Sequence, residues 1–206
     1  MAGIYFHYPF CSQACNYCNF HFSTQTKYRQ QMQQAMKSEL YLRKSELKTP
    51  IESIYFGGGS PSLLPASFFH KVIKSVNDCF KLGNDIEITL EANPNDLTLQ
   101  NLKDLKKSGV NRISIGVQSF HDYELKMMNR IHNSNQGLKA IEWTSKVFDN
   151  FSVDLIYGLP KSNISTWAHN LDILTSFNPP HISSYALTVE PKTVLFRQVD
   201  KGDIKL

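Results

Sequence analysis

The chain has 206 residues, of which 41% are hydrophobic and 19% charged, with a formal net charge of +4 at pH 7. It has no apolar run near the roughly 18 residues that span a bilayer and no secretory signal pattern, so we expect a cytoplasmic protein. Its lysines and arginines are spread along the chain without a basic run, which argues against a nucleic-acid partner.

Short β-branched and aromatic runs alternate with segments of helical period along the chain. The pattern predicts six strands, at Ile4–Tyr8, Ser53–Phe56, Ile86–Glu91, Arg112–Val117, Ser152–Tyr157 and His181–Val189. It predicts five helices between them, at Thr26–Leu47 with a cap at Ser23 or Thr24, and at Ala66–Phe80, Leu99–Ser108, Asn135–Phe148 and Ser165–Phe177.

Strict alternation of strand and helix predicts an α/β fold with a parallel sheet and right-handed crossovers. A full eight-unit barrel needs about 250 residues, whereas six βα units of roughly 35 residues fill about 210. The chain therefore fits an open sheet or a partial (β/α)6 barrel of the TIM type. We expect residues 1–206 to form one domain, with Lys192–Leu206 beginning a further element, as if the chain were cut there.

The first predicted strand leads into the motif C-x-x-x-C-x-x-C, formed by Cys11, Cys15 and Cys18. Three thiolates so close together are typical of a metal site, and a [4Fe-4S] cluster held by three cysteines keeps one iron open for another ligand. The alternative is a zinc site with His7 or His21 as the fourth ligand. A disulfide framework is disfavoured because the cysteines are few and crowded, so we expect a reducing compartment.

In parallel βα architectures, functional groups gather at the carboxyl ends of the strands. The second predicted strand leads into Gly57–Ser60, which is either a tight turn or a loop whose open N–H groups accommodate a carboxylate. Glu91 and Asp154 stand beside apolar strand segments, where a charge needs a partner, so we expect each to contact a ligand or a polar network. Arg130 and His132 close a helical stretch, and stabilising its C-terminal dipole is their alternative role.

The segment Tyr5–Phe20, YFHYPFCSQACNYCNF, resembles the cluster loop of the radical S-adenosylmethionine (SAM) superfamily. Later motifs resemble, in order, the family of oxygen-independent coproporphyrinogen oxidases and haem chaperones: YFGGGSPSLL, EITLEANP, GVNRISIGVQSF, RIH, VDLIYGLP and ISSYALTVEPKT. The resemblance covers the radical SAM core of that family. It implies a [4Fe-4S] cluster held by Cys11, Cys15 and Cys18, with SAM chelated on the fourth iron.

The resemblance also implies a set of SAM contacts, carried over motif by motif. They are Tyr5, Tyr17, Gly58, Gly59, Ser60, Glu91, Gln118, Arg130, Asp154 and Ala186. The departures from the family pattern are small, because Ser60 keeps the hydroxyl of the commoner threonine and Asn19 replaces a common aspartate. The catalytic residues stay unknown.

In this family the reduced cluster passes an electron to SAM, and in the oxidases the resulting 5′-deoxyadenosyl radical takes hydrogen from a propionate, which becomes a vinyl group. The resemblance therefore implies a tetrapyrrole partner, either haem or coproporphyrinogen III, and an electron donor such as a flavodoxin or ferredoxin. Two departures favour the haem-chaperone branch. Phe20 replaces the further cysteine of the oxidases, and the chain lacks their long N-terminal extension.

We therefore expect a protein that binds haem and delivers it to haem-requiring membrane proteins. Oxygen-independent coproporphyrinogen oxidation is the alternative, in which case the protein is an oxidoreductase. A zinc or electron-transfer domain without SAM chemistry is the second alternative. The haem-binding histidine of the chaperones belongs to a C-terminal domain that has no match in this sequence, so no haem ligand is assigned.

Overall fold

The computed structural model describes residues 2–205 as an α/β fold built on one six-stranded sheet. All five strand pairings are parallel, and the strand order in space follows the order in the chain. The strands are β1 (Ala2–Tyr8), β2 (Ile51–Gly58), β3 (Leu82–Ala92), β4 (Arg112–Gln118), β5 (Phe151–Tyr157) and β6 (His181–Ala186). The six predicted strands are thus confirmed, although β3 begins before Ile86 and β6 ends before Val189.

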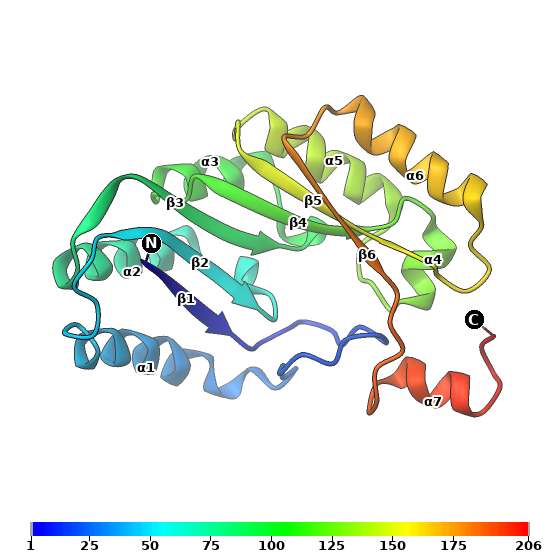
Figure 1. The fold of residues 1–206 in the computed structure, drawn as a ribbon, viewed down its shortest axis with the longest axis horizontal. Coiled ribbons are helices and arrows are strands. Elements are labelled where there is room, and N and C mark those ends of the chain that lie inside the picture. The colour runs from blue at the N-terminus through cyan, green and yellow to red at the C-terminus, as the bar shows by residue number, and fades with distance from the viewer. Residues whose placement is uncertain (1, 206) are drawn as a thin grey trace.

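Helices cover the outside of the curved sheet, and the strands point the same way (Figure 1). They are α1 (Arg29–Leu42), α2 (Ala66–Cys79), α3 (Leu99–Lys107), α4 (Asp122–Met127), α5 (Ser134–Ser145), α6 (Ile164–Ser176) and α7 (Val194–Asp200). Short 3₁₀ turns lie at Thr26–Tyr28, Pro61–Leu63 and Pro94–Asp96. The sequence pattern did not delimit α4, because one and a half turns show no clear helical period. None of the helices among residues 2–205 is long and apolar enough to cross a bilayer.

The predicted cap of the first helix at Ser23 or Thr24 is wrong, since α1 begins only after the 3₁₀ turn at Thr26–Tyr28. Ser23 is engaged elsewhere. Its N–H donates to the Pro9 carbonyl at 2.7 Å, and its carbonyl accepts from the Cys11 N–H at 3.0 Å. The extended backbone that this pairing requires closes a loop and delays the start of the helix.

The predicted end of the same helix at Leu47 is also wrong, because α1 ends at Leu42. The chain turns at Arg43, whose guanidinium contacts Glu39 at 3.0 Å and Glu46 at 2.9 Å. These exposed ion pairs join the last turn of the helix to the turn that follows it. Each contributes little to stability, so they mark the helix end and do not by themselves fix it.

The hydrophobic core lies between the sheet and the surrounding helices. Strand residues Ile54, Leu90, Ile113 and Val153 are fully buried together with Phe69, Val76, Ile141 and Leu174 from the helices. Successive strand side chains point to opposite faces, so the residues that alternate with this apolar set face the inside of the curve. Several of those inner residues are polar: Glu91, Ser114, Asp154 and Ser183. The sheet thus offers an apolar face to the helices and a polar face to the interior.

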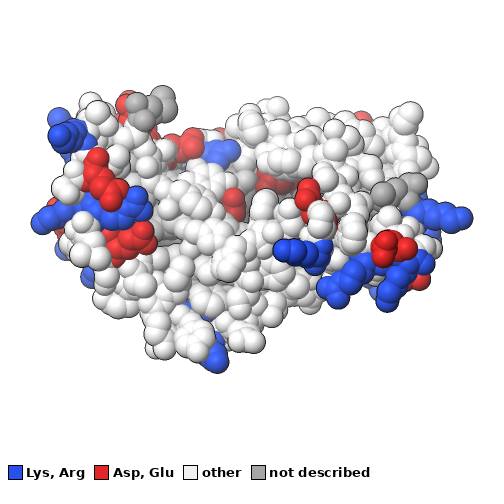
Figure 2. Space-filling view, turned by 60° about the horizontal axis from the view of Figure 1, so that its bottom comes forward, with Lys and Arg blue, Asp and Glu red and all other residues white. Residues whose placement is uncertain are grey.

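Charged side chains leave the middle of one molecular face largely uncovered. Figure 2 shows lysines and arginines mainly toward the two ends of this face, mixed there with acidic side chains, and further acidic side chains in its hollowed middle. The face carries no continuous basic stripe of the kind that follows a nucleic-acid backbone.

Candidate cofactor site

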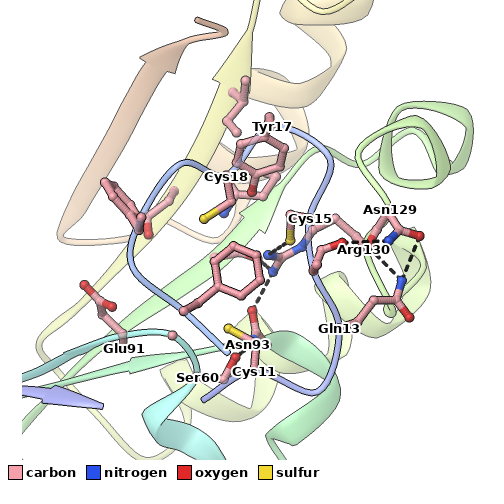
Figure 3. Close-up of a pocket in the computed structure, with 18 of the residues that line it drawn as sticks. Cys11, Gln13, Cys15, Tyr17, Cys18, Ser60, Glu91, Asn93, Asn129 and Arg130 are labelled. Carbon is pink, nitrogen blue, oxygen red and sulfur yellow. Dashed lines mark hydrogen bonds between the residues drawn. The ribbon is translucent and has the colours of Figure 1, made fainter. Parts of the chain in front are cut away.

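A cavity of about 600 Å³ lies at the carboxyl ends of the strands. Its walls include the three cysteines and every predicted SAM contact except Tyr5. Tyr5 is 56% exposed, and its hydroxyl lies 3.0 Å from Nδ1 of His7. Figure 3 shows the labelled side chains of the cavity, which come from the loop after β1, from the ends of β2 and β3, and from the turn after α4. The topology therefore brings together residues that lie far apart in the sequence.

The loop of residues 11–22, called here the cysteine loop, carries all three cysteines. Ser23 closes its base, and the turn after β2 packs against that base. The Gly59 N–H donates to the Tyr8 carbonyl at 2.7 Å, and the Ser60 N–H donates to the Phe10 carbonyl at 2.9 Å. A Cβ built on Gly59 would lie 2.8 Å from the Phe10 carbonyl oxygen and 3.0 Å from the Cys11 sulfur. Glycine is required there because the two segments touch through their backbones.

Of the two alternatives for this glycine loop, the structure favours the tight turn over a loop that presents open N–H groups to a carboxylate. The N–H groups of Gly59 and Ser60 are bonded to the segment after β1, and the Gly58 N–H donates to Glu91 at 3.0 Å. These donors are therefore engaged within the protein. The loop serves as a tight junction that places the Ser60 hydroxyl, itself 5% exposed, at the wall of the cavity.

The three cysteine thiols are half-buried and face one cavity. Burial raises the pKa of Cys11 and of Cys18, and the neighbouring Cys15 raises both further. Free thiolates are therefore disfavoured, and a cationic metal group would stabilise them. Thiolates that converge on a cavity with room for a further ligand suit a [4Fe-4S] cluster with one open iron.

The zinc alternative finds no support in the geometry. Among residues 2–205, no three Cys, His, Asp or Glu side chains converge closely enough to hold a single metal ion. The ring of His7 is engaged on both sides, by the Tyr5 hydroxyl at 3.0 Å and by the His21 carbonyl at 3.1 Å. A cluster of several irons bridges a wider set of thiols than one zinc ion does.

Arg130 connects the cysteine loop to two strands. Its Nη2 donates to the Asn93 side-chain oxygen and to the Gly116 carbonyl, each at 2.7 Å, and its Nη1 lies 3.5 Å from the Cys15 sulfur (Figure 3). Asn93 in turn donates to the Ser60 hydroxyl at 2.8 Å. The side chain of Arg130 therefore points into the site and is not directed at the end of the helix before it. Asn93 was not among the expected contacts, although its place directly after a strand is a signal for it.

Two acidic side chains form a second group in the wall. Glu91 accepts hydrogen bonds from the Tyr55 hydroxyl at 2.8 Å and from the Gly58 N–H at 3.0 Å, and Asp154 lies 3.4 Å from the Ser114 hydroxyl. Burial raises the pKa of both carboxyl groups. Each acid thus lies in a polar network, as its position beside an apolar strand segment predicts.

The remaining predicted contacts lie at the far wall of the cavity. Gln118 ends β4 with a positive φ of 70°, and Ala186 ends β6. Tyr17 packs against the small apolar cluster that includes Met128 and Ile156, and burial raises its pKa. The cavity therefore combines thiols, an arginine and carboxylates with an apolar side.

Comparisons with known proteins agree with this geometry. Residues 5–174 match the model of the radical SAM superfamily. The haem chaperone HemW of Bacillus subtilis is 34% identical over 210 residues, a match that covers 100% of this chain and 55% of HemW. HemW of Escherichia coli K12 is 36% identical over 200 residues, which is 93% of this chain and 52% of HemW.

A solved structure of coproporphyrinogen III oxidase (HemN) from Escherichia coli, described as a radical SAM enzyme, matches with a TM-score of 0.88 and 26% identity. The match covers 100% of this chain and 48% of that one. The chain thus spans about half the length of the curated relatives it matches. The family model and these relatives, taken with the cysteine loop and the parallel sheet around it, show that the chain belongs to the radical SAM superfamily.

Proposed function

We propose that this chain is the radical SAM core of a HemW-like haem chaperone. Family membership implies a [4Fe-4S] cluster and SAM. The haem assignment rests on one observation, the 34–36% identity to haem chaperones over nearly the whole chain, against 26% to the oxidase. The proposed partners are haem, an electron donor such as a flavodoxin or ferredoxin, and haem-requiring membrane proteins.

In this proposal Cys11, Cys15 and Cys18 hold the cluster, which when bound and reduced supplies an electron to SAM. The fit is supported by three thiols around one cavity, by the raised pKa of Cys11 and of Cys18, and by the close glycine contact at the Cys11 sulfur. The protein itself shields the thiols from bulk water and leaves one side of the site open for SAM.

Arg130 is proposed to bind the SAM carboxylate. Its Nη groups are directed at Cys15 and Asn93, and its Nε is buried without a partner among residues 2–205. A buried guanidinium with unused donor capacity suits a carboxylate, because charge-assisted hydrogen bonds are the stronger kind.

The acidic and apolar walls are proposed to bind the rest of SAM. Glu91 and Asp154 offer acceptors for its ammonium group and its ribose hydroxyls. Ile156 and Ala186, together with Tyr17, offer an apolar side for the adenine ring. These roles follow from the chemistry of each side chain and from its place in the wall.

Coproporphyrinogen oxidation is the second candidate function, and the TM-score of 0.88 to HemN favours it. Phe20 argues against it. This side chain is 70% exposed and lies in the cavity wall, at the position where the resembled oxidases carry a further cysteine. The cysteine loop therefore carries an apolar side chain where the oxidases carry a thiol.

Anaerobic reconstitution with iron and sulfide tests the cluster, and electron paramagnetic resonance with and without SAM tests the open iron. We expect the spectrum of the reduced cluster to change when SAM is added, and an unchanged spectrum would overturn the proposal. Cys15→Ser should lose iron, whereas the matched variant Cys79→Ser should keep it, because Cys79 packs against the core in α2 outside the cavity.

Haem binding and coproporphyrinogen turnover distinguish the two functions. Titration of the full-length protein with haem should produce a Soret band, and incubation of that protein with coproporphyrinogen III, SAM and a reductant should form no vinyl product. Vinyl formation would replace the chaperone proposal with oxidase activity, and the absence of haem binding would remove the chaperone proposal.

A further inference from the structure

The tip of the cysteine loop is fastened to the turn that follows α4. The Gln13 side-chain amide donates to the Asn129 carbonyl at 2.8 Å and to the Asn129 side-chain oxygen at 2.9 Å. The Asn129 amide donates in return to the Ala14 carbonyl at 2.7 Å. Figure 3 shows Gln13 and Asn129 facing each other beside Arg130. These three hydrogen bonds between residues 13–14 and 129 are called the clasp.

Asn16 strengthens the same junction one step further along the loop. Its backbone N–H donates to the Met128 carbonyl at 3.1 Å, and its side-chain amide donates to the Met127 carbonyl at 2.8 Å. Both acceptors belong to the end of α4, where carbonyl groups have no partner within the helix. The loop thus supplies hydrogen-bond donors to carbonyl groups at the end of the helix, and the same hydrogen bonds hold the loop in place.

Asn129 has a backbone conformation that few residues adopt. Its φ is 59°, in the left-handed region that favours glycine and, among other residues, asparagine. The Asn129 N–H donates to Lys126 at 3.1 Å and the Arg130 N–H donates to Leu125 at 2.9 Å, which is the hydrogen-bond pattern of a Schellman C-cap. Glycine could make this turn equally well. Only a side chain with both an acceptor and a donor can also close the clasp.

The same turn directs the next residue into the cavity. Directly after Asn129 the chain presents Arg130, whose guanidinium lies 3.5 Å from the Cys15 sulfur and 2.7 Å from the Asn93 oxygen. One backbone turn therefore sets the position of the arginine, and the side chain within that turn sets the shape of the loop that carries the cysteines. The two parts of the site are coupled through residue 129.

We infer that Asn129 and Gln13 are positioning residues that hold the cysteine loop in a shape ready for the cluster before any metal binds. The inference rests on the proposed function and adds the residues that organise its site. The loop from Cys11 to Cys18 has no helix or strand of its own, so ordering it costs conformational entropy. Because the clasp already orders part of the loop in the unloaded protein, less conformational entropy is lost when the cluster binds. We therefore expect the clasp to slow loss of the cluster.

The test uses two variants with matched controls. Asn129→Gly keeps the left-handed turn and removes the two clasp hydrogen bonds that its side chain makes, while the bond to its backbone carbonyl can remain. Its control Asn178→Gly changes an asparagine with a φ of 47° at the end of α6. Gln13→Ala removes the donor, and its control Gln100→Ala removes a glutamine whose amide donates to both carboxylate oxygens of Asp104 on the surface of α3.

Two readouts separate the inference from the proposed function. In the unloaded protein, hydrogen exchange of the Asn16 amide should be about fivefold faster in both variants, the factor that corresponds to one net hydrogen bond. In the reconstituted protein, a chelator should remove iron about fivefold faster from both variants than from the controls. Thermal unfolding checks that the fold itself is kept.

The outcomes are distinct. Wild-type rates of exchange and iron loss in Asn129→Gly and Gln13→Ala would overturn the inference. If the wild-type protein binds no cluster, the proposed function fails, and exchange of the Asn16 amide still decides whether the clasp orders the loop. If Asn129→Gly does not fold, Gln13→Ala carries the test, because Gln13 lies on an exposed loop and its removal leaves the turn intact.

Discussion

At the scale of single residues, Arg130 joins the most parts of the site. Arg130→Gln should weaken SAM binding about tenfold or more, because it removes a charge-assisted hydrogen bond to the carboxylate. Iron content should stay close to that of the wild type, since glutamine can still donate to Asn93 or Gly116. Equilibrium binding of SAM to the reconstituted protein measures the change.

The control for this prediction is Arg112→Gln. Arg112 also donates from one strand to its neighbours, to the Thr89 hydroxyl at 3.3 Å and to the Ser152 hydroxyl at 3.1 Å, but it lies outside the cavity. SAM affinity equal to that of the wild type in Arg130→Gln, or an equal loss in both variants, would contradict the proposed role.

His132 should make the protein less stable in mild acid. It is 2% exposed, and burial, aided by the charge of Arg130, lowers its pKa to about 4. Its pKa in the unfolded chain is about 6.5, so the unfolded state binds the proton first as the pH falls. The stabilising contribution is present above about pH 6.5 and is lost between there and pH 4.

We expect the free energy of unfolding to fall by about 2 kcal/mol between pH 7 and pH 5 on account of this histidine. Urea denaturation at the two pH values measures it. His132→Gln should show a smaller fall, whereas His70→Gln, on the exposed side of α2, should behave like the wild type. An identical pH dependence in His132→Gln would contradict the assignment.

The sequence located the charged residues of the site but not their partners. Glu91 and Asp154 were expected in polar networks because charges beside apolar strands need them, and the structure confirms this. Asn93 and Asn129 were missed because the local sequence does not show what their amide groups bind, although the place of Asn93 directly after a strand is a signal for it. Their importance comes from residues far away in the chain, Ser60 and Gln13, and only the folded structure brings these together.

At the scale of elements, the turn after β2 and the base of the cysteine loop are in close backbone contact. Gly59→Ala should speed the loss of iron and lower stability, because its Cβ would meet the Phe10 carbonyl oxygen at 2.8 Å and the Cys11 sulfur at 3.0 Å. Chelator-driven iron release from the reconstituted protein measures the first effect, and urea denaturation measures the second.

Gly158→Ala is the control for this junction. Its φ of 74° strains any other residue, but a Cβ there meets nothing within 4 Å. We expect a stability loss of about 1–2 kcal/mol with normal iron retention. If both variants lose iron at the same rate, contact with the cysteine loop is not the reason for the glycine at position 59.

Capping chemistry accompanies two of the accurately predicted helix starts, although α2 begins at the predicted Ala66 without a side-chain cap hydrogen bond. α5 and α6 each begin within one residue of the prediction, and each has a capping box, at Asn133 and at Asn163. The first residue of α1 was missed by three, and its cap residue, Tyr28, makes no side-chain cap hydrogen bond. A helix that begins with a local side-chain signal can be delimited from sequence. A helix whose start is set by a distant pairing, as that of Ser23 sets α1, cannot.

At the scale of the whole molecule, the centre and the edge of the sheet differ strongly in burial. Ile113, Ile115 and Val117 of β4 are 0% exposed, whereas none of the six residues of β6 is fully buried, and among residues 2–205 this strand pairs only with β5. Hydrogen exchange should therefore be slower in β4 than in β6, because opening near an edge exposes less buried surface. Equal protection of the two strands would show that the sheet opens only as a unit.

The fold class was predictable because every level of the pattern agreed. Strand composition, helical period and strict alternation all indicate βα units, and consistency of this kind is what specifies a fold. The sequence alone left an open sheet and a partial barrel as alternatives, since both use the same units. The curvature that distinguishes them arises from the twist of each strand pair, which has no residue pattern of its own.

The order of the strands also bears on how the molecule forms. Each of the five pairings joins strands that are consecutive in the chain. Each strand after β1 therefore finds one partner already synthesised when it leaves the ribosome. Each new unit can dock on an existing edge, so the sheet can grow in the direction of synthesis, one unit after another.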